Sequence, residues 1–281
     1  SDYKSVLMNP VMKRLFYSLI SCAIGLSMSA QASTQLLYSY NFDGMNDSGL
    51  TAINHNLSET PGSGVWTKTS GDYLNYSPGV LGSTSAYRSN SGKLTLSSDS
   101  SNSLGVNATD GFSLSFSVKD DSIGTYKEML NITSSTGDTI ISKKNSGNAT
   151  TAGAWEFFNN GTAQSNNIGN WAQATVPLDK YMNIVLTFQN GTLLGYKDGV
   201  QFMTATGVNF DGDVKSIQFG KEGSAIFDDV ALYSGVLNQG DITYLATNHP
   251  KQFSEGGIPE PTTISLGIIG LGLLALRRRR A

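Results

Sequence analysis

Residues 183–200 read Asn-Ile-Val-Leu-Thr-Phe-Gln-Asn-Gly-Thr-Leu-Leu-Gly-Tyr-Lys-Asp-Gly-Val. Within this stretch, Asn190-Gly191 separates two apolar runs. Asn-Gly between such runs is the strongest short hairpin signal, because a type I′ turn needs a positive φ at both central positions. A second turn, Asp198-Gly199, leads into a third run that ends at Ala205. The stretch therefore predicts three antiparallel strands that follow one another as a meander.

Further strands are predicted along the rest of the chain. The clearest covers 112–118, where Phe and other apolar residues alternate with three serines, and this period of two predicts one buried and one solvent-exposed face. Shorter runs predict strands at 36–42, 129–132, 139–142, 155–158, 214–219 and 225–233. A single internal helix is expected over 239–247, with Asn238 as its cap and Asp241 in its first turn. About a dozen strands and one short helix predict an all-β, two-sheet antiparallel sandwich.

Three segments resemble the LamG-like, concanavalin A-like jelly rolls. Residues 183–199 are similar to the family's central W-x-H-V-A-x-T … Y-V-D-G block, with Asn183 where the family has His. Residues 227–242, Phe-Asp-Asp-Val-Ala-Leu-Tyr-Ser-Gly-Val-Leu-Asn-Gln-Gly-Asp-Ile, are similar to its closing I-D-D-V-R-I-Y-x-R-A-L-S-x-x-E-I segment. The opening residues 40–44, Tyr-Asn-Phe-Asp-Gly, fit its first strand. The resemblance implies a jelly-roll sandwich over residues 33–250.

The same resemblance implies a structural Ca²⁺ ion. In LamG-like and related sandwiches a calcium ion often ties the first strand to the last, which would use Asp43 and Asp229, with Asp228 as a further candidate. Hard cations of this kind take carboxylate and carbonyl oxygens as ligands. Turn chemistry is the alternative explanation, because Asp-Gly is common in turns and aspartates also cap backbone groups.

Residues 258–281 read Ile-Pro-Glu-Pro-Thr-Thr-Ile-Ser-Leu-Gly-Ile-Ile-Gly-Leu-Gly-Leu-Leu-Ala-Leu-Arg-Arg-Arg-Arg-Ala. They contain the tripeptide Pro259, Glu260, Pro261, then an uncharged apolar run over 262–276, and then the cluster Arg277, Arg278, Arg279, Arg280. At about 1.5 Å per residue the run covers roughly 22 Å as a helix, against a ~30 Å hydrocarbon core, so we expect a short transmembrane helix with snorkelling arginines. The arginines are expected to stay cytoplasmic. A buried element of the fold is the alternative, and the four consecutive arginines argue against it.

This order of features resembles the PEP-CTERM sorting signal of Gram-negative bacteria. The resemblance implies that an exosortase, a membrane-embedded protease, recognises Pro259-Glu260-Pro261, removes the tail and delivers the protein to the cell surface or the extracellular matrix. The helix would then be a transient membrane anchor, and residues 251–258 would link it to the sandwich. The chain is therefore expected to be a substrate of processing and not a processing enzyme.

The first 32 residues show the pattern of a leader and a secretory signal peptide. A basic n-region after Met12 is followed by an apolar stretch over 15–28 and by Ala30-Gln31-Ala32, a small-x-small cleavage site. Translation is expected to start at Met8 or Met12. We therefore expect the secretion machinery to export the chain across the inner membrane, and signal peptidase to remove a signal helix. An uncleaved signal anchor is the alternative, and the serines that interrupt the apolar stretch argue against it.

Composition narrows the function of the exported part, residues 33–258. It contains twelve Lys and Arg against twenty Asp and Glu, a formal charge of −8. This acidic balance argues against nucleic-acid binding, which needs a basic surface. The single cysteine, Cys22, lies in the signal peptide, so no disulfide is expected and stability must come from the core, with bound metal as an additional source.

The exported part also lacks the usual patterns of a catalytic site. Glucanases of this fold use glutamates two or four residues apart on one strand, whereas the glutamates here stand at 59, 128, 156, 222 and 255. A Ser-His-Asp arrangement needs a histidine, and His55 and His249 both lie in polar, turn-like contexts. Both are expected to be solvated surface residues. No catalytic residue is expected.

Aromatic residues are the candidates for stacking on sugar rings, although most are explained equally well as core residues: Trp66, Trp155, Trp171, Tyr73, Tyr76 and Tyr87. No ligand-binding residue is assigned. The sequence indicates an exported surface or matrix protein whose LamG-like domain binds a polysaccharide. A structural or adhesive protein without a specific glycan ligand is the alternative hypothesis, and a polysaccharide hydrolase is the third.

Overall fold

The structure, a computed structural model, describes part of the chain. The chain separates into two compact units, Ser1–Ala32 and Ser33–Ala281, and the described residues all belong to the second. They are residues 34–40, 42, 64–68, 73–76, 79–83, 86–89, 92–98, 103–120, 127–144, 155–159, 180–221, 225–251 and 253. The predicted signal peptide, transmembrane helix, tripeptide 259–261 and arginines 277–280 lie outside them. Over the described ranges, no helix is long and apolar enough to cross a membrane.

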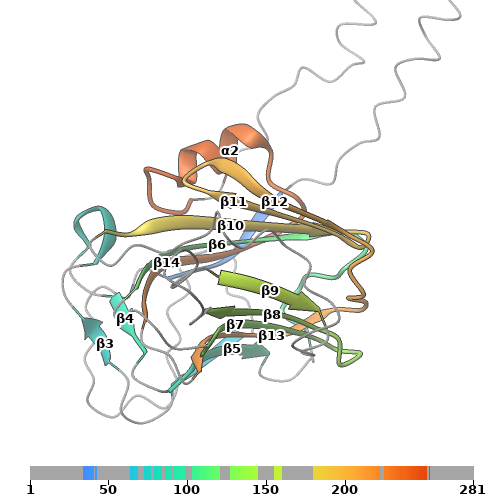
Figure 1. The fold of residues 1–281 in the computed structure, drawn as a ribbon, viewed down its shortest axis with the longest axis horizontal. Coiled ribbons are helices and arrows are strands. Elements are labelled where there is room, and N and C mark those ends of the chain that lie inside the picture. The colour runs from blue at the N-terminus through green and yellow to red at the C-terminus, as the bar shows by residue number, and fades with distance from the viewer. Residues whose placement is uncertain are drawn as a thin grey trace, which may run out of the picture. The chain divides into compact units, whose positions relative to one another are not determined.

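Two antiparallel sheets make up the described fold (Figure 1). The larger sheet has the order β12-β11-β10-β6-β14-β4-β3, with β1 also paired to β14. Its strands are β1 (Gln35–Tyr40), β3 (Tyr73–Tyr76), β4 (Ala86–Arg88), β6 (Phe112–Asp120), β10 (Met182–Gln189), β11 (Thr192–Lys197), β12 (Val200–Thr206) and β14 (Ala225–Ser234). The smaller sheet has the order β2-β5-β13-β7-β8-β9. Its strands are β2 (Gly64–Lys68), β5 (Leu94–Ser98), β7 (Lys127–Ser134), β8 (Thr139–Lys144), β9 (Trp155–Asn159) and β13 (Val214–Lys221). The predicted all-β, two-sheet sandwich is confirmed.

The predicted meander around Asn190-Gly191 is also confirmed. Strand β10 pairs with β11, and β11 pairs with β12, both antiparallel. At the first turn φ is 48° at Asn190 and 72° at Gly191, and at the second turn φ is 48° at Asp198 and 81° at Gly199. Positive φ at both central positions is the type I′ geometry, which suits the right-handed twist of the flanking strands. Local sequence therefore sets the register of these three strands.

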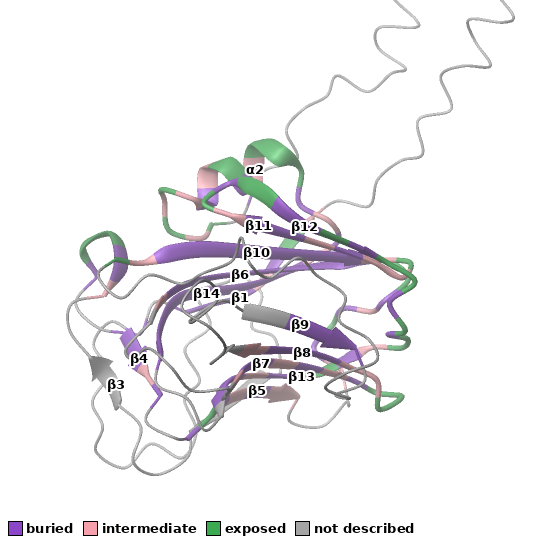
Figure 2. Cartoon of the chain, in the orientation of Figure 1, coloured by how far each residue is buried: buried purple, intermediate pink, exposed green. Residues whose placement is uncertain are grey.

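Strand β6 alternates as predicted, but both of its faces are buried. The core between the two sheets takes up its apolar side chains, Phe112, Leu114, Phe116 and Val118. The serines between them were expected in solvent, yet Ser113 and Ser115 are fully buried and Ser117 nearly so. The expectation of a wet face is wrong because a helix and the segment after it cover this side of the sheet (Figure 2). We name this side, which points away from the smaller sheet, the outer face.

Helix α2 (Gln239–Leu245) packs on the outer face. The side-chain Oδ1 of its N-cap Asn238 accepts a hydrogen bond from the backbone N–H of Asp241 at 3.0 Å, as the capping pattern predicts. The apolar side of the helix joins a second buried cluster with residues of the sheet and of the following segment, and we name this the outer cluster: Leu36, Val185, Tyr196, Ala231, Tyr233, Leu237, Ile242, Leu245 and Phe253. The larger sheet is thus covered on both sides over its central strands.

Candidate functional site

Strand β14 contains a β-bulge that carries two consecutive aspartates. Its register with β6 shifts between Asp228 and Ala231, so that Asp229 and Val230 together stand opposite one residue of β6. At Asp229 φ is 48°, a left-handed conformation that Asp adopts more readily than most residues other than Gly and Asn. Val230 joins the core between the sheets. At the bulge, both aspartate side chains therefore form hydrogen bonds with groups outside that core.

Asp228 is fully buried and holds a short helical turn, η1 (Val80–Gly82), against β14. Its Oδ2 accepts hydrogen bonds from the backbone N–H of Val80 at 2.8 Å and from Oγ of Ser83 at 2.7 Å. Its Oδ1 accepts one from the backbone N–H of Asp229 at 2.8 Å. Burial raises the pKa of Asp228 from 3.8 to about 7; the charge of Asp229 adds to the rise, and the hydrogen bonds oppose it. Asp228 is therefore a structural anchor that titrates near neutral pH.

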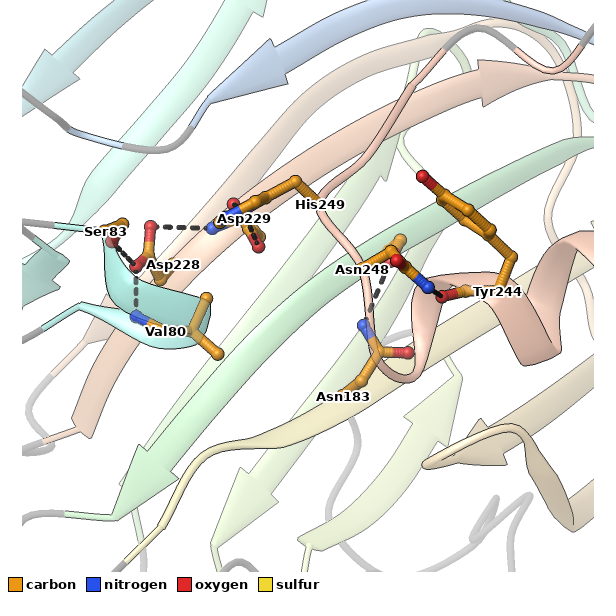
Figure 3. A network of polar contacts seen from close by, with 9 residues as sticks. Val80, Ser83, Asn183, Asp228, Asp229, Tyr244, Asn248 and His249 are labelled. Carbon is orange, nitrogen blue, oxygen red and sulfur yellow. Dashed lines mark hydrogen bonds and ion pairs between the residues drawn. The ribbon is translucent and has the colours of Figure 1, made fainter.

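Asp229 pairs with His249 (Figure 3). Nδ1 of His249 lies 2.9 Å from Oδ1 and 2.7 Å from Oδ2 of Asp229. The aspartate side chain is 3% exposed and the histidine side chain 46%, so one partner is buried and the other reaches solvent. An ionised carboxylate offers only acceptors, so Nδ1 carries the hydrogen when Asp229 is charged. The pair joins β14 to a segment twenty residues later in the chain.

The segment that carries the histidine, residues 246–253, follows α2 and lies along the outer face; we name it the strap, and all of it except residue 252 is described. Oη of Tyr233 donates a hydrogen bond to the carbonyl oxygen of Lys251 at 3.2 Å. The buried ring of Phe253 lies 5.7 Å from the ring of Tyr233 and 5.6 Å from that of Tyr244. Nζ of Lys251 lies 3.9 Å from the centre of the Tyr244 ring. Polar and apolar contacts therefore fix the strap to both β14 and α2.

Asn183, which stands where the resembled family has a histidine, also lies on the outer face. Its Nδ2 donates to Oγ of Ser115 at 3.3 Å, and its backbone N–H donates to Oδ1 of Asp198 at 2.9 Å. Its Oδ1 has no hydrogen-bond partner among the described residues, although Asn183 is only 6% exposed. A buried polar atom without a partner costs about 1–3 kcal/mol. The described residues therefore supply no hydrogen-bond donor to this buried oxygen.

The described residues include only one of the two predicted calcium ligands. Asp43 lies outside the described residues, and Asp229 faces His249. Calcium takes about six to eight oxygen ligands, but both oxygens of Asp228 already accept hydrogen bonds from protein groups. No group of three His, Cys, Asp or Glu side chains in the described ranges is placed to hold a metal ion. These residues alone do not fit calcium, and the calcium site stays a prediction that depends on Asp43.

Of the other candidates from the sequence, the structure describes the side chains of Tyr87 and His249. Tyr87 is fully buried and its ring stacks on that of Phe227 at 6.1 Å, so it is a core residue. The structure describes only the backbone of four other candidates for sugar stacking, which lie in β2, β3 and β9: Trp66, Tyr73, Tyr76 and Trp155. Trp171 lies outside the described residues. His249 is exposed at the surface as expected, but it also pairs with Asp229, which was not expected from the sequence. No local pattern predicts that pair, since the bulge and the path of the strap create it.

Comparison with known families finds one match, in the tail. Residues 257–281 match the PEP-CTERM protein-sorting motif, which confirms the resemblance of the tail. The motif implies an exported protein with a membrane-anchored sorting signal of Gram-negative bacteria, processed by an exosortase. The match does not extend to the sandwich. No curated protein matches the sequence.

Solved structures support the fold of the sandwich. Domain 4 of AbnA, a GH43 extracellular arabinanase from Geobacillus stearothermophilus in complex with arabinotriose, is 18% identical with a TM-score of 0.52, over 76% of this chain and 99% of that chain. The sialidase of Trypanosoma rangeli is 13% identical with a TM-score of 0.51, over 83% of this chain and 38% of the sialidase chain. At these identities the similarity concerns the fold alone. The described sandwich is thus of the jelly-roll-like kind expected from the sequence.

Proposed function

We propose that this protein is an exported, exosortase-processed surface or matrix protein whose β-sandwich binds a carbohydrate polymer. The observation that carries the proposal is the order of its parts. A folded sandwich extends to the docked residue Phe253, and the sorting motif begins four residues later, at 257. A sorting signal placed directly after a folded domain suits a protein whose domain works outside the cell once the tail has been removed.

Carbohydrate is the ligand class that the fold supports best. Domain 4 of the arabinanase shares this fold and was solved with arabinotriose. The exported part, residues 33–258, has a formal charge of −8, so an acidic polymer would be repelled over distances of about a Debye length, roughly 8 Å at physiological salt. We therefore propose a neutral polysaccharide as the ligand and not a polyanion.

Binding is proposed in preference to catalysis because the titratable groups of the described site have structural tasks. Asp228 holds η1 against β14 through its three hydrogen bonds. The pair of Asp229 and His249 fixes the strap. A hydrolase would need such groups free to face a substrate.

The test is a gel-shift of the full-length chain in gels that contain one purified polysaccharide each. Arabinan and other neutral polymers are compared with a polyanion as the control, and free arabinotriose is added as a competitor. Retardation by a neutral polymer, with none by the polyanion, is the expected result. Unchanged mobility in every neutral polymer would contradict the proposal and favour a structural or adhesive role. Shortening of a retained polymer would show turnover and contradict the binding-only role.

A further inference from the structure

The docked strap leaves very little chain between the sandwich and the sorting signal. Phe253 is buried in the outer cluster, and Pro259 follows six residues later. Six residues span at most about 20 Å when fully extended, whatever their conformation. Before processing, Phe253 and the outer cluster that holds it therefore lie within about this distance of the tripeptide.

This length is small compared with the sandwich itself. A domain of about 220 residues has a radius of gyration of roughly 17 Å. A protein that recognises a peptide backbone commonly binds it extended along several residues, and residues 254–258 are all that the chain offers ahead of the tripeptide while the strap is docked. A membrane-embedded protease that binds the tripeptide would therefore have the folded sandwich close to its substrate-binding site.

The strap can supply more chain without disturbing the two sheets. Its described residues belong to neither sheet, and they are fixed by the contact of His249 with Asp229, by the hydrogen bond from Tyr233 to Lys251 and by the packing of Phe253. Contacts of this kind can open locally while the core between the sheets stays closed. Release of the eight residues after α2 adds about 25 Å of reach.

We propose that the strap is a docked length of chain that, once released, lengthens the connection between the sandwich and the tripeptide. Its release from β14 and α2 lets the processing protease engage residues 259–261 while the sandwich remains folded, and the strap contacts set the rate of tail removal. This inference rests on the proposed function, because it requires that the tail is cleaved. The partner that the released strap serves is the membrane-embedded protease.

The experiment follows tail removal from the full chain by pulse-chase in cells that process it. One variant inserts eight Gly and Ser residues between Ser254 and Glu255, which lengthens the connection and leaves the strap contacts in place. A second variant, Phe253→Ala, weakens the docking, and a third combines the two changes. The control places the same insertion at Gly207, in an exposed turn where a side chain would meet open space.

The expected result is faster tail removal, by about threefold or more, in both the insertion and Phe253→Ala, because slack raises the effective concentration of the tripeptide at the protease. The combined variant should be no faster than the insertion alone, and the Gly207 control should match the unaltered chain. An insertion without effect, or one that slows removal, would overturn the inference. Acceleration by the insertion but not by Phe253→Ala would also overturn it. The rate of tail removal would then depend on the length of the connection and not on the docking of the strap. If the unaltered chain keeps its tail, the proposed function itself fails, and the inference falls with it.

Discussion

Nδ1 of His249 lies 2.7 Å from Oδ2 of Asp229, and this contact joins the bulge of β14 to the strap. Strand β14 also pairs with β1, β4 and β6, so the contact connects the strap to a strand in the interior of the larger sheet. The left-handed conformation of Asp229 is part of the arrangement, because the extra residue of a bulge re-aims the side chain next to it. The strap therefore docks on β14 at the bulge.

Replacement of Asp229 separates this pairing from the predicted calcium site. Asp229→Ala removes the acceptor of His249, and we expect the free energy of unfolding to fall by about 1–3 kcal/mol, since a hydrogen bond to a charged group is lost. The loss should be the same with added Ca²⁺ and with a chelator, because the pair needs no metal. Thermal unfolding under both conditions measures it.

The matched control for this experiment is Asp211→Ala. Asp211 is an exposed aspartate whose hydrogen bonds with Thr136 and Asp138 use its backbone atoms, so we expect little change in either condition. A loss for Asp229→Ala that appears only with calcium would contradict the structural role of the pair. It would instead support the calcium site that the family resemblance implies.

Asp228 predicts a dependence of stability on pH. Its pKa is raised by burial from 3.8 to about 7, so the folded protein holds this proton more tightly than the unfolded chain does. The resulting stabilisation is complete below pH ~4 and is lost as the pH rises through about 7, and it amounts to at most about 4 kcal/mol. Asp228→Asn lacks this titration. Urea unfolding of both proteins from pH 4 to 8 should therefore show a steeper downward slope in the wild type than in the variant, and parallel curves would refute the assignment.

Two glycines with similar backbone angles give a test of packing. At Gly220, where φ is 65°, an added Cβ would lie 2.6 Å from Cβ of Ser89, whereas at Gly207, where φ is 69°, it would meet nothing within 4 Å. Gly207→Ala measures the cost of the left-handed conformation, about 1 kcal/mol. Gly220→Ala should cost about 1–3 kcal/mol more, because the clash with Ser89 is added. Equal losses in chemical denaturation would show that β13 does not pack against Ser89 as described.

The hydrogen bond from Tyr233 to the strap can be removed without changing the rings. Tyr233→Phe leaves the carbonyl of Lys251 without this donor, and we expect a loss of about 0.5–1.5 kcal/mol in unfolding free energy. Tyr244→Phe is the control, since its ring contacts with Phe253 and Lys251 are kept. Faster cleavage by a protease within residues 246–253 in Tyr233→Phe alone would locate the effect on the strap. An equal response of the two variants would contradict it.

The parts of this structure that the sequence predicts are those that depend on neighbouring residues. Asn190-Gly191 specifies a type I′ turn by its own backbone preferences, and Asn238 caps α2 through a residue only three positions away. The sorting motif is likewise a linear signal, readable without a fold. These features come from interactions along the chain, so a single sequence is sufficient to find them.

The parts that could not be predicted depend on distant segments. Ser113 alternates with apolar residues as an exposed side chain would, yet it is buried because its Oγ donates to the carbonyl of Gly235 and accepts from the backbone N–H of Leu237. The pairing of His249 with Asp229 likewise needs a bulge that shifts one strand and a strap that returns across it. Neither event leaves a periodic signal, because each is decided by tertiary packing.

Sorting through the tripeptide is tested by following the C-terminus of the protein in cells. Full-length chain is compared with a variant in which Pro259, Glu260 and Pro261 are all alanine, and the location and mass of each product are measured by fractionation and intact-mass analysis. We expect the unaltered chain to lose its tail and leave the inner membrane, and the variant to keep its tail and stay there. Release of the variant with the same mass as the processed wild type would contradict sorting through this motif.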